Sequence, residues 1–100
     1  MAYKSRLASP EITELFEAIM TLKNTEEYYR FFEDLATVGE LQSLAQRLSV
    51  AKKLVAEEKY TTIAEETGAS TATISRVKRC LNYGADGYKL VFQRLAEKED

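Results

Sequence analysis

The sequence predicts an all-α protein built from six helices. Apolar residues recur three or four positions apart along most of the 100 residues, which is the spacing of one face of an α-helix. No stretch shows the alternation of apolar and polar residues that marks a β-strand. The single proline, Pro10, stands where the first helix is expected to begin. These three observations favour a helical fold throughout.

The first expected helix begins at Ser9 and Pro10, because a serine cap followed by proline in the first turn is a typical helix start. Its apolar face comprises Ile12, Leu15, Phe16, Ile19 and Leu22. The second helix begins at Asn24, with Glu27 as the reciprocal acid. Its apolar residues spread over more than one stripe, so two of its sides should meet apolar partners. They are Tyr28, Tyr29, Phe31, Phe32 and Leu35.

A long third helix is expected after Thr37, which forms a capping box with Glu40. Its apolar side comprises Leu41, Leu44, Leu48, Ala51 and Val55. The polar run 57–59 leads into a fourth helix, for which Thr62 and Glu65 are the expected capping box.

Residues 60–81 have the pattern of a helix-turn-helix. Ala64 is small where two such helices pack closely, and Gly68 follows at the turn, where a positive φ is cheap only for glycine. Ser70 is the expected N-cap of the second helix. Ile74 and Val77 are three residues apart, so the same face of that helix should turn inward.

The fifth helix is expected to end at residues 82–84, and Asp86 is expected to cap a sixth. The apolar residues of that helix are Leu90, Val91 and Leu95. We therefore expect a flexible N-terminus at 1–9 and a single helical domain at 10–98. A domain of this size has a thin core, and such chains often gain stability by forming dimers.

The formal net charge is −2, but the charges are unevenly distributed. Residues 69–83 contain three basic residues, Arg76, Lys78 and Arg79, and no acid. A basic helix after a glycine turn fits the major groove of DNA. The alternative is a plain helical hairpin with a solvated basic face.

Ala72, Ser75, Arg76 and Arg79 are expected opposite the inward face, and Lys78 on its flank, where its ammonium can reach a phosphate. Small side chains in the first turn suit contacts with base edges. The residues expected to contact DNA are Ser70, Thr71, Ala72, Thr73, Ser75, Arg76, Lys78 and Arg79.

Other classes of function find little support. The chain has no histidine, which removes the commonest general base and metal ligand. Its one cysteine, Cys80, excludes an internal disulfide, fits a reducing cytosol and is interpreted as a packing residue. No apolar run has membrane-spanning length. We expect no catalytic residue, metal or cofactor.

Two runs of sequence resemble the tryptophan repressor. AEETGASTATISRVKRCL is similar to its DNA-reading head, and GELQSLAQRLSVAKKLV, residues 39–55, to the helix before that head. With its final LVFQRLAEK, the chain over residues 10–98 resembles the compact YerC/YecD-type members of that superfamily. The resemblance implies a six-helix domain, a homodimer with interlaced N-terminal helices, and a transcription regulator on a two-fold operator.

The resemblance also implies a position for a small ligand. The two arginines that grip tryptophan in the repressor match Arg47 and Arg76. Where the repressor has the glycine against which the indole lies, this chain has Val77. Tryptophan is therefore not expected as the corepressor. Three roles stay open for Arg47 and Arg76: an ion pair with an acid, binding of phosphate, or binding of another small ligand.

The interpretation is a cytoplasmic bacterial DNA-binding regulator, a repressor that acts by steric exclusion as a homodimer on double-stranded DNA. Two alternatives stay open. One is a repressor gated by a small effector other than tryptophan. The other is a helical protein-interaction module that uses the aromatic second helix and binds no DNA.

Overall fold

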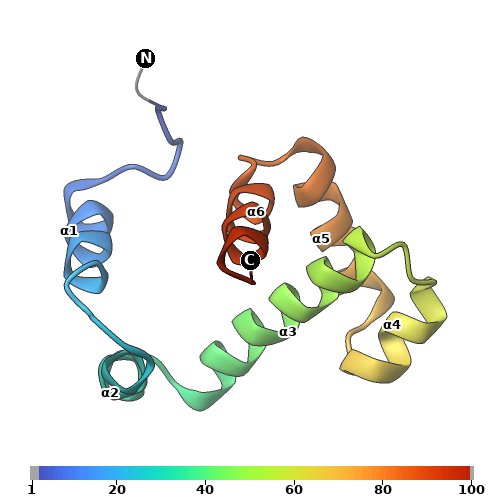
Figure 1. Ribbon diagram of the computed structural model, residues 1–100, viewed down its shortest axis with the longest axis horizontal. Coiled ribbons are helices and arrows are strands. Elements are labelled where there is room, and N and C mark those ends of the chain that lie inside the picture. Colours follow the sequence, from blue (N-terminus) through green and yellow to red (C-terminus); the bar gives the residue numbers. More distant parts are fainter. Residues whose placement is uncertain (1–2, 100) are drawn as a thin grey trace. The chain divides into compact units, whose positions relative to one another are not determined.

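The computed structural model describes residues 3–99, and these residues form α-helices and no strand (Figure 1). The six helices are α1 (Pro10–Ile19), α2 (Thr25–Leu35), α3 (Val38–Val55), α4 (Tyr60–Thr67), α5 (Thr71–Tyr83) and α6 (Gly87–Glu99). The predicted all-α class and six helices are confirmed. None of the helices described is both long and apolar enough to cross a membrane.

The chain divides into two compact units at residues 38 and 39. The first contains α1 and α2, and the second contains α3 to α6. Residues 1 and 2 of the expected flexible N-terminus lie outside the described residues. Residues 3–9 are not helical, and the Ser5 hydroxyl there accepts a hydrogen bond of 3.0 Å from the Leu7 amide.

Side-chain caps begin both helices of the first unit. The Ser9 hydroxyl accepts from the Ile12 amide at 3.1 Å, and the Asn24 side chain accepts from the Glu27 amide at 3.0 Å, so both predicted caps are confirmed. The reciprocal contact differs, because the Glu27 carboxylate accepts from the Lys23 amide at 2.8 Å. Lys23 lies before the helix, where its amide lacks an intrahelical partner.

Neither α1 nor α2 has a buried residue. Large apolar side chains in these helices and at the C-cap of α1 are instead substantially exposed, with Phe16 at 57%, Met20 at 73% and Tyr29 at 61%. Ile12, Tyr28 and Leu35 are exposed as well. Large apolar side chains exposed on both helices are typical of an interaction surface.

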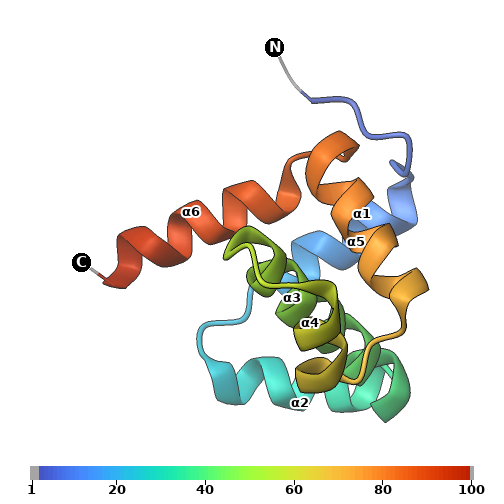
Figure 2. The ribbon, with the colours of Figure 1, turned by 90° about the vertical axis from the view of Figure 1, so that its right-hand side faces the viewer.

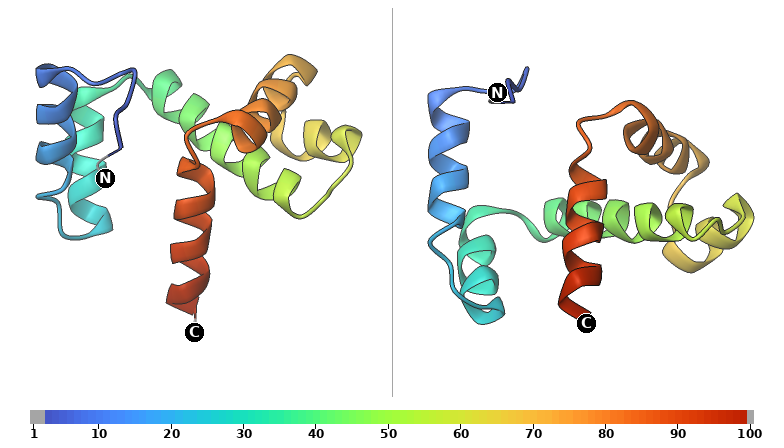
Figure 3. Two further views of the ribbon diagram at one scale, coloured as in Figure 1. Left: turned by 90° about the horizontal axis from the view of Figure 1, so that it is seen from above. Right: turned by 45° about the horizontal axis from the view of Figure 1, so that its top comes forward.

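In the second unit, α4 and α5 lie at one end of α3, and α6 runs across it (Figures 2 and 3). A cluster of buried apolar residues joins α3 to the two shorter helices: Val50, Ala51, Ile63, Ala69, Ile74 and Val77. Leu54, Leu81, Tyr88 and Phe92 pack against its edge. We call this set the head core.

The predicted apolar side of α3 is only partly correct. Ala51 is buried, but Leu44, Leu48 and Val55 are 53%, 39% and 58% exposed, and Val50 takes the inward position that they were expected to hold. Two apolar faces therefore share this helix. The face with Val50 and Ala51 meets α4 and α5, and the face with the leucines is exposed in the single chain.

The start of α4 differs from expectation, whereas Asp86 stands where the start of α6 is expected. Helix α4 begins at Tyr60, and its N-cap Lys59 makes no side-chain cap bond, so the predicted Thr62–Glu65 capping box is wrong. The Lys59 carbonyl accepts a hydrogen bond of 3.0 Å from the Ile63 amide, so the first helical hydrogen bond already places the start of the helix at Tyr60. Asp86 does precede α6, at φ 63°, with its carboxylate 3.5 Å from the Lys89 ammonium.

Gly68→Ala should destabilise the protein by about 1–2 kcal/mol, because Gly68 has a φ of 73° and an L residue is strained there. Crowding is not the cause, since an added Cβ would lie 3.9 Å from the Gln46 side-chain nitrogen. Urea unfolding at fixed protein concentration measures the effect. The matched control is Gly39→Ala in α3, where a Cβ meets nothing within 4 Å and stability should not fall. Equal stability of the two variants would contradict this explanation.

Candidate nucleic-acid interface

The turn between α4 and α5 is held by hydrogen bonds from three segments. The Thr67 hydroxyl donates to the Ile63 carbonyl at 2.6 Å and accepts from the Ala69 amide at 3.1 Å. The Gly68 amide donates to the Ala64 carbonyl at 2.9 Å, and the Gln46 side chain of α3 donates to the Thr67 carbonyl at 3.1 Å. These bonds occupy polar groups at the end of α4 and fix where α5 begins.

Ser70 caps α5 as predicted. Its hydroxyl accepts from the Thr73 amide at 3.1 Å and donates to the Thr73 hydroxyl at 3.1 Å. The hydroxyl proton of Ser70 is therefore engaged within the protein. Of the residues expected to contact DNA, Ser70 and Thr73 therefore also hydrogen-bond to each other to cap the helix.

Helix α5 has one packed side and one exposed side, as its sequence predicts. Ile74 is fully buried, Val77 is 3% exposed, and Leu81 is partly buried beside them. Thr73 is half-buried. The other expected contact residues in the helix are all exposed: Thr71, Ala72, Ser75, Arg76, Lys78 and Arg79.

The exposed side of α5 carries three positive charges. Neither arginine nor Lys78 takes part in an ion pair among residues 3–99. The ammonium of Lys78 instead lies 5.5 Å from the centre of the Tyr60 ring, at the start of α4. The exposed side of α5 therefore presents basic groups that are available to an anionic partner.

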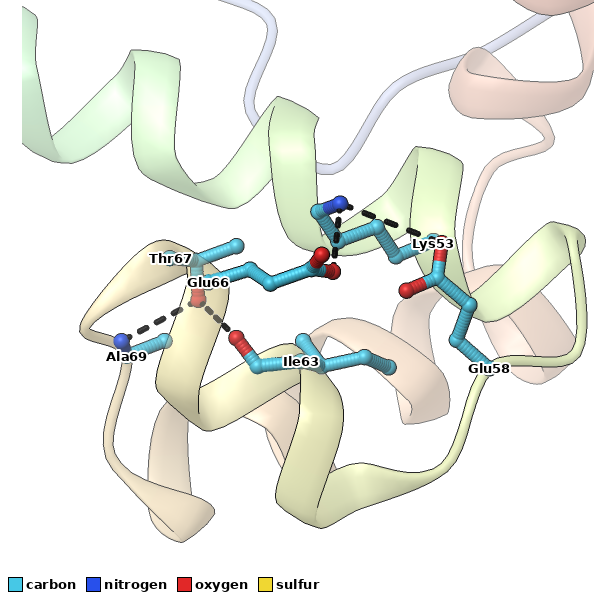
Figure 4. Close-up of polar contacts among 6 residues, drawn as sticks. All are labelled: Lys53, Glu58, Ile63, Glu66, Thr67 and Ala69. Atoms are coloured by element: carbon cyan, nitrogen blue, oxygen red, sulfur yellow. Dashed lines mark hydrogen bonds and ion pairs between the residues drawn. The ribbon is translucent and has the colours of Figure 1, made fainter.

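A cluster of charged side chains ties α4 to α3 (Figure 4). The Lys53 ammonium donates to the Glu66 carboxylate at 2.8 Å and lies 3.8 Å from the Glu58 carboxylate. The bond to Glu66 raises the pKa of Lys53, and the same bond lowers the pKa of Glu66. The cluster holds the first helix of the motif against α3.

Arg47 and Arg76, the expected ligand-binding pair, are both exposed. Neither forms an ion pair with an acid in the described part of the chain. Val77 lies in the same buried cluster as Val50 and Ala51. The side chain at the position where the family has glycine is thus part of the head core.

Cys80 is exposed, so its predicted role as a packing residue is wrong. It comes four residues after Arg76 and shares the exposed side of α5. No group of three or more potential ligands (histidine, cysteine or acid) gathers anywhere in residues 3–99.

Sequence reasoning does not single out three residues that shape this region: Gln46, Lys53 and Tyr60. Each acts on a segment distant in the chain, across a helix–helix contact. A local sequence pattern indicates caps and helix faces, but it does not indicate contacts between residues that are distant in the sequence. The sequence marks this turn through Ala64 and Gly68, and neither residue points to Gln46.

Comparison with known proteins identifies the family to which this chain is similar. Residues 10–96 match the family described as Trp repressor protein. The uncharacterized protein YerC of Bacillus subtilis (strain 168) is 56% identical over 94 residues, which span 94% of this chain and 90% of YerC.

Two crystal structures have the same fold. A TrpR-like protein from Eubacterium eligens ATCC 27750 is 55% identical, with a TM-score of 0.88 over 91% of this chain and 94% of that one. A candidate Trp repressor from Staphylococcus aureus is 54% identical, with a TM-score of 0.87 over 91% of each chain. The helices and the turn described above are therefore similar to those of solved proteins.

Glu66→Gln should lower the free energy of unfolding at pH 7, because it removes the charge that Lys53 holds. The pKa of Glu66 is lower in the folded protein, so its contribution is present above the unfolded pKa of about 4.3 and is lost as pH falls through the folded value. The gap between wild type and variant should therefore close in acid. Urea unfolding between pH 7 and pH 3 tests this. Glu65→Gln, one residue away and exposed, is the control, and a gap that persists at low pH would contradict the prediction.

Proposed function

Because the chain belongs to the Trp repressor family, we propose that it is a cytoplasmic bacterial regulator that binds double-stranded DNA through α4 and α5. The observation that carries the proposal is the exposed side of α5. It bears three basic residues with no ion-pair partner in residues 3–99, while the opposite side is anchored in the head core. A helix held in this way can enter the major groove without rearrangement.

Each exposed residue of α5 has a role in this proposal. The methyl and hydroxyl groups of Thr71, Ala72 and Ser75 face base edges, where they suit thymine methyls and bridging water. Arg76 and Arg79 are placed to bind a guanine edge or a phosphate through their two-pronged side chains. Phosphate contacts supply affinity, and contacts to base edges supply the choice of sequence.

The functional form in this proposal is an interlaced homodimer in which residues 10–98 act as one domain. Support comes from the apolar side chains of α1 and α2, such as Phe16 and Tyr29, that are exposed in the single chain. Burial against a second copy would remove that surface from water. Two such heads would read a two-fold operator and block access to it, which is repression by steric exclusion.

The direct test is selection of binding sites from random duplex DNA with the purified protein. We expect inverted repeats, with half-sites separated by one helical turn, roughly 34–36 Å between centres. Lys78→Ala and Arg79→Ala should each bind more weakly and should each lower the log–log salt slope by about 0.9 per lost phosphate contact. Lys98→Ala, an exposed charge near the end of α6, serves as the matched control.

Two results would count against the proposal. Failure of the wild type to enrich any duplex would favour a protein-interaction module that binds no DNA. Enrichment of sites without two-fold symmetry would contradict the dimeric arrangement.

A second candidate function is a repressor gated by a small molecule other than tryptophan. The observation that favours it is the exposure of Arg47 and Arg76, neither of which pairs with an acid in residues 3–99. Guanidinium groups that carry free charge suit a phosphate or carboxylate ligand. DNA binding measured with and without a pool of small metabolites separates this candidate from constitutive repression.

L-Tryptophan should give no saturable heat in calorimetry at millimolar concentration, and DNA affinity should be the same with and without it. The reason is Val77, which is 3% exposed and belongs to the head core. A β-branched side chain is stiff at χ1 and cannot easily swing aside for an indole. Val77→Gly should cost about 1–4 kcal/mol through lost packing and the helix penalty of glycine. Tight binding of tryptophan by the wild type, with a tenfold rise in DNA affinity, would overturn this prediction.

A further inference from the structure

One contact joins the exposed surfaces of the two helices of the motif. The Lys78 ammonium, from the middle of α5, lies 5.5 Å from the centre of the ring of Tyr60, the first residue of α4. Tyr60 is 36% exposed. The contact therefore spans the turn at the surface and not in the interior.

The chemistry of this pair suits an ammonium that must keep its charge. The face of an aromatic ring attracts a cation through its quadrupole. A carboxylate partner would hold the ammonium too, but it would also neutralise it, whereas a ring leaves the full charge for a second partner. No acid lies in the first turn of α4, so the ring has no competitor there.

The place of Lys78 in the motif indicates the second partner of its ammonium. In a helix-turn-helix the first helix crosses the DNA backbone while the second lies in the groove. An ammonium that extends from α5 to the start of α4 is therefore beside the backbone, where phosphates are the available anions. A free lysine side chain samples many rotamers, and a side chain that is already ordered loses less freedom on binding.

We propose that Tyr60 is a positioning residue of the DNA interface, whose ring holds the Lys78 ammonium in place to meet a backbone phosphate. The inference rests on the proposed DNA binding and adds a residue from α4 to a surface otherwise formed by α5. Tyr60 acts through Lys78, and the ring face is the part of Tyr60 that matters.

The test is a double-mutant cycle on the selected duplex, read by fluorescence anisotropy. Tyr60→Phe keeps the ring face and should bind within about twofold of wild type. Tyr60→Leu removes the face, keeps apolar volume, and should weaken binding by about two- to fivefold. In the Lys78→Ala background, Tyr60→Leu should have no further effect. Tyr83→Leu, which changes an 85% exposed tyrosine of α5, is the control and should change nothing.

A readout without DNA separates this inference from the proposed function. In the free protein the protons on the terminal carbon of Lys78 should show ring-current shifts by NMR, retained in Tyr60→Phe and lost in Tyr60→Leu. If the wild type binds no duplex, the proposed function fails and the inference falls with it. If the wild type binds and Tyr60→Leu binds equally well, more tightly, or additively with Lys78→Ala, only the inference is overturned. Tighter binding would show that the ring withholds the ammonium from DNA.

Discussion

The helix-turn-helix depends on one small buried cluster, the head core between α3 and the two helices of the motif. Val50 and Ala51 from α3 meet Ile63, Ile74 and Val77, and every one of these side chains is nearly or fully removed from water. Loss of packing at any of these positions costs both transfer energy and the energy of a cavity. The exposed side of α5 is presented to a partner only because the other side is fixed in this cluster.

The sequence predicted the motif well because its signals are local. A glycine at the turn, a serine cap and two apolar residues three apart are set by hydrogen bonds and spacing within a few residues, and Gly68, Ser70, Ile74 and Val77 all behave as expected. The apolar side of α3 was harder to predict. That helix has apolar residues on two sides, and which of them turns inward is decided by the helices packed against it.

The errors have the same origin. Thr62 and Glu65 have the spacing of a capping box, but the helix already begins at Tyr60, and both residues therefore lie inside it. Cys80 resembles a core residue by type, yet the orientation that buries Val77 leaves it exposed. Pairs such as Gln46 with Thr67 join residues 21 positions apart, and no helical or strand period encodes them.

In the proposed DNA interface, the side chains that cap α5 differ from those assigned to base edges, and this division bears on how the proposed specificity changes. Ser70 and Thr73 hold the start of the helix, and Ile74 and Val77 anchor it. Thr71, Ala72 and Ser75 carry none of these duties and are exposed, so substitutions there leave stability nearly unchanged. Under the proposed DNA binding, specificity can therefore change at these positions with little loss of stability. The same three positions are the natural ones to randomise when retargeting this scaffold by directed evolution.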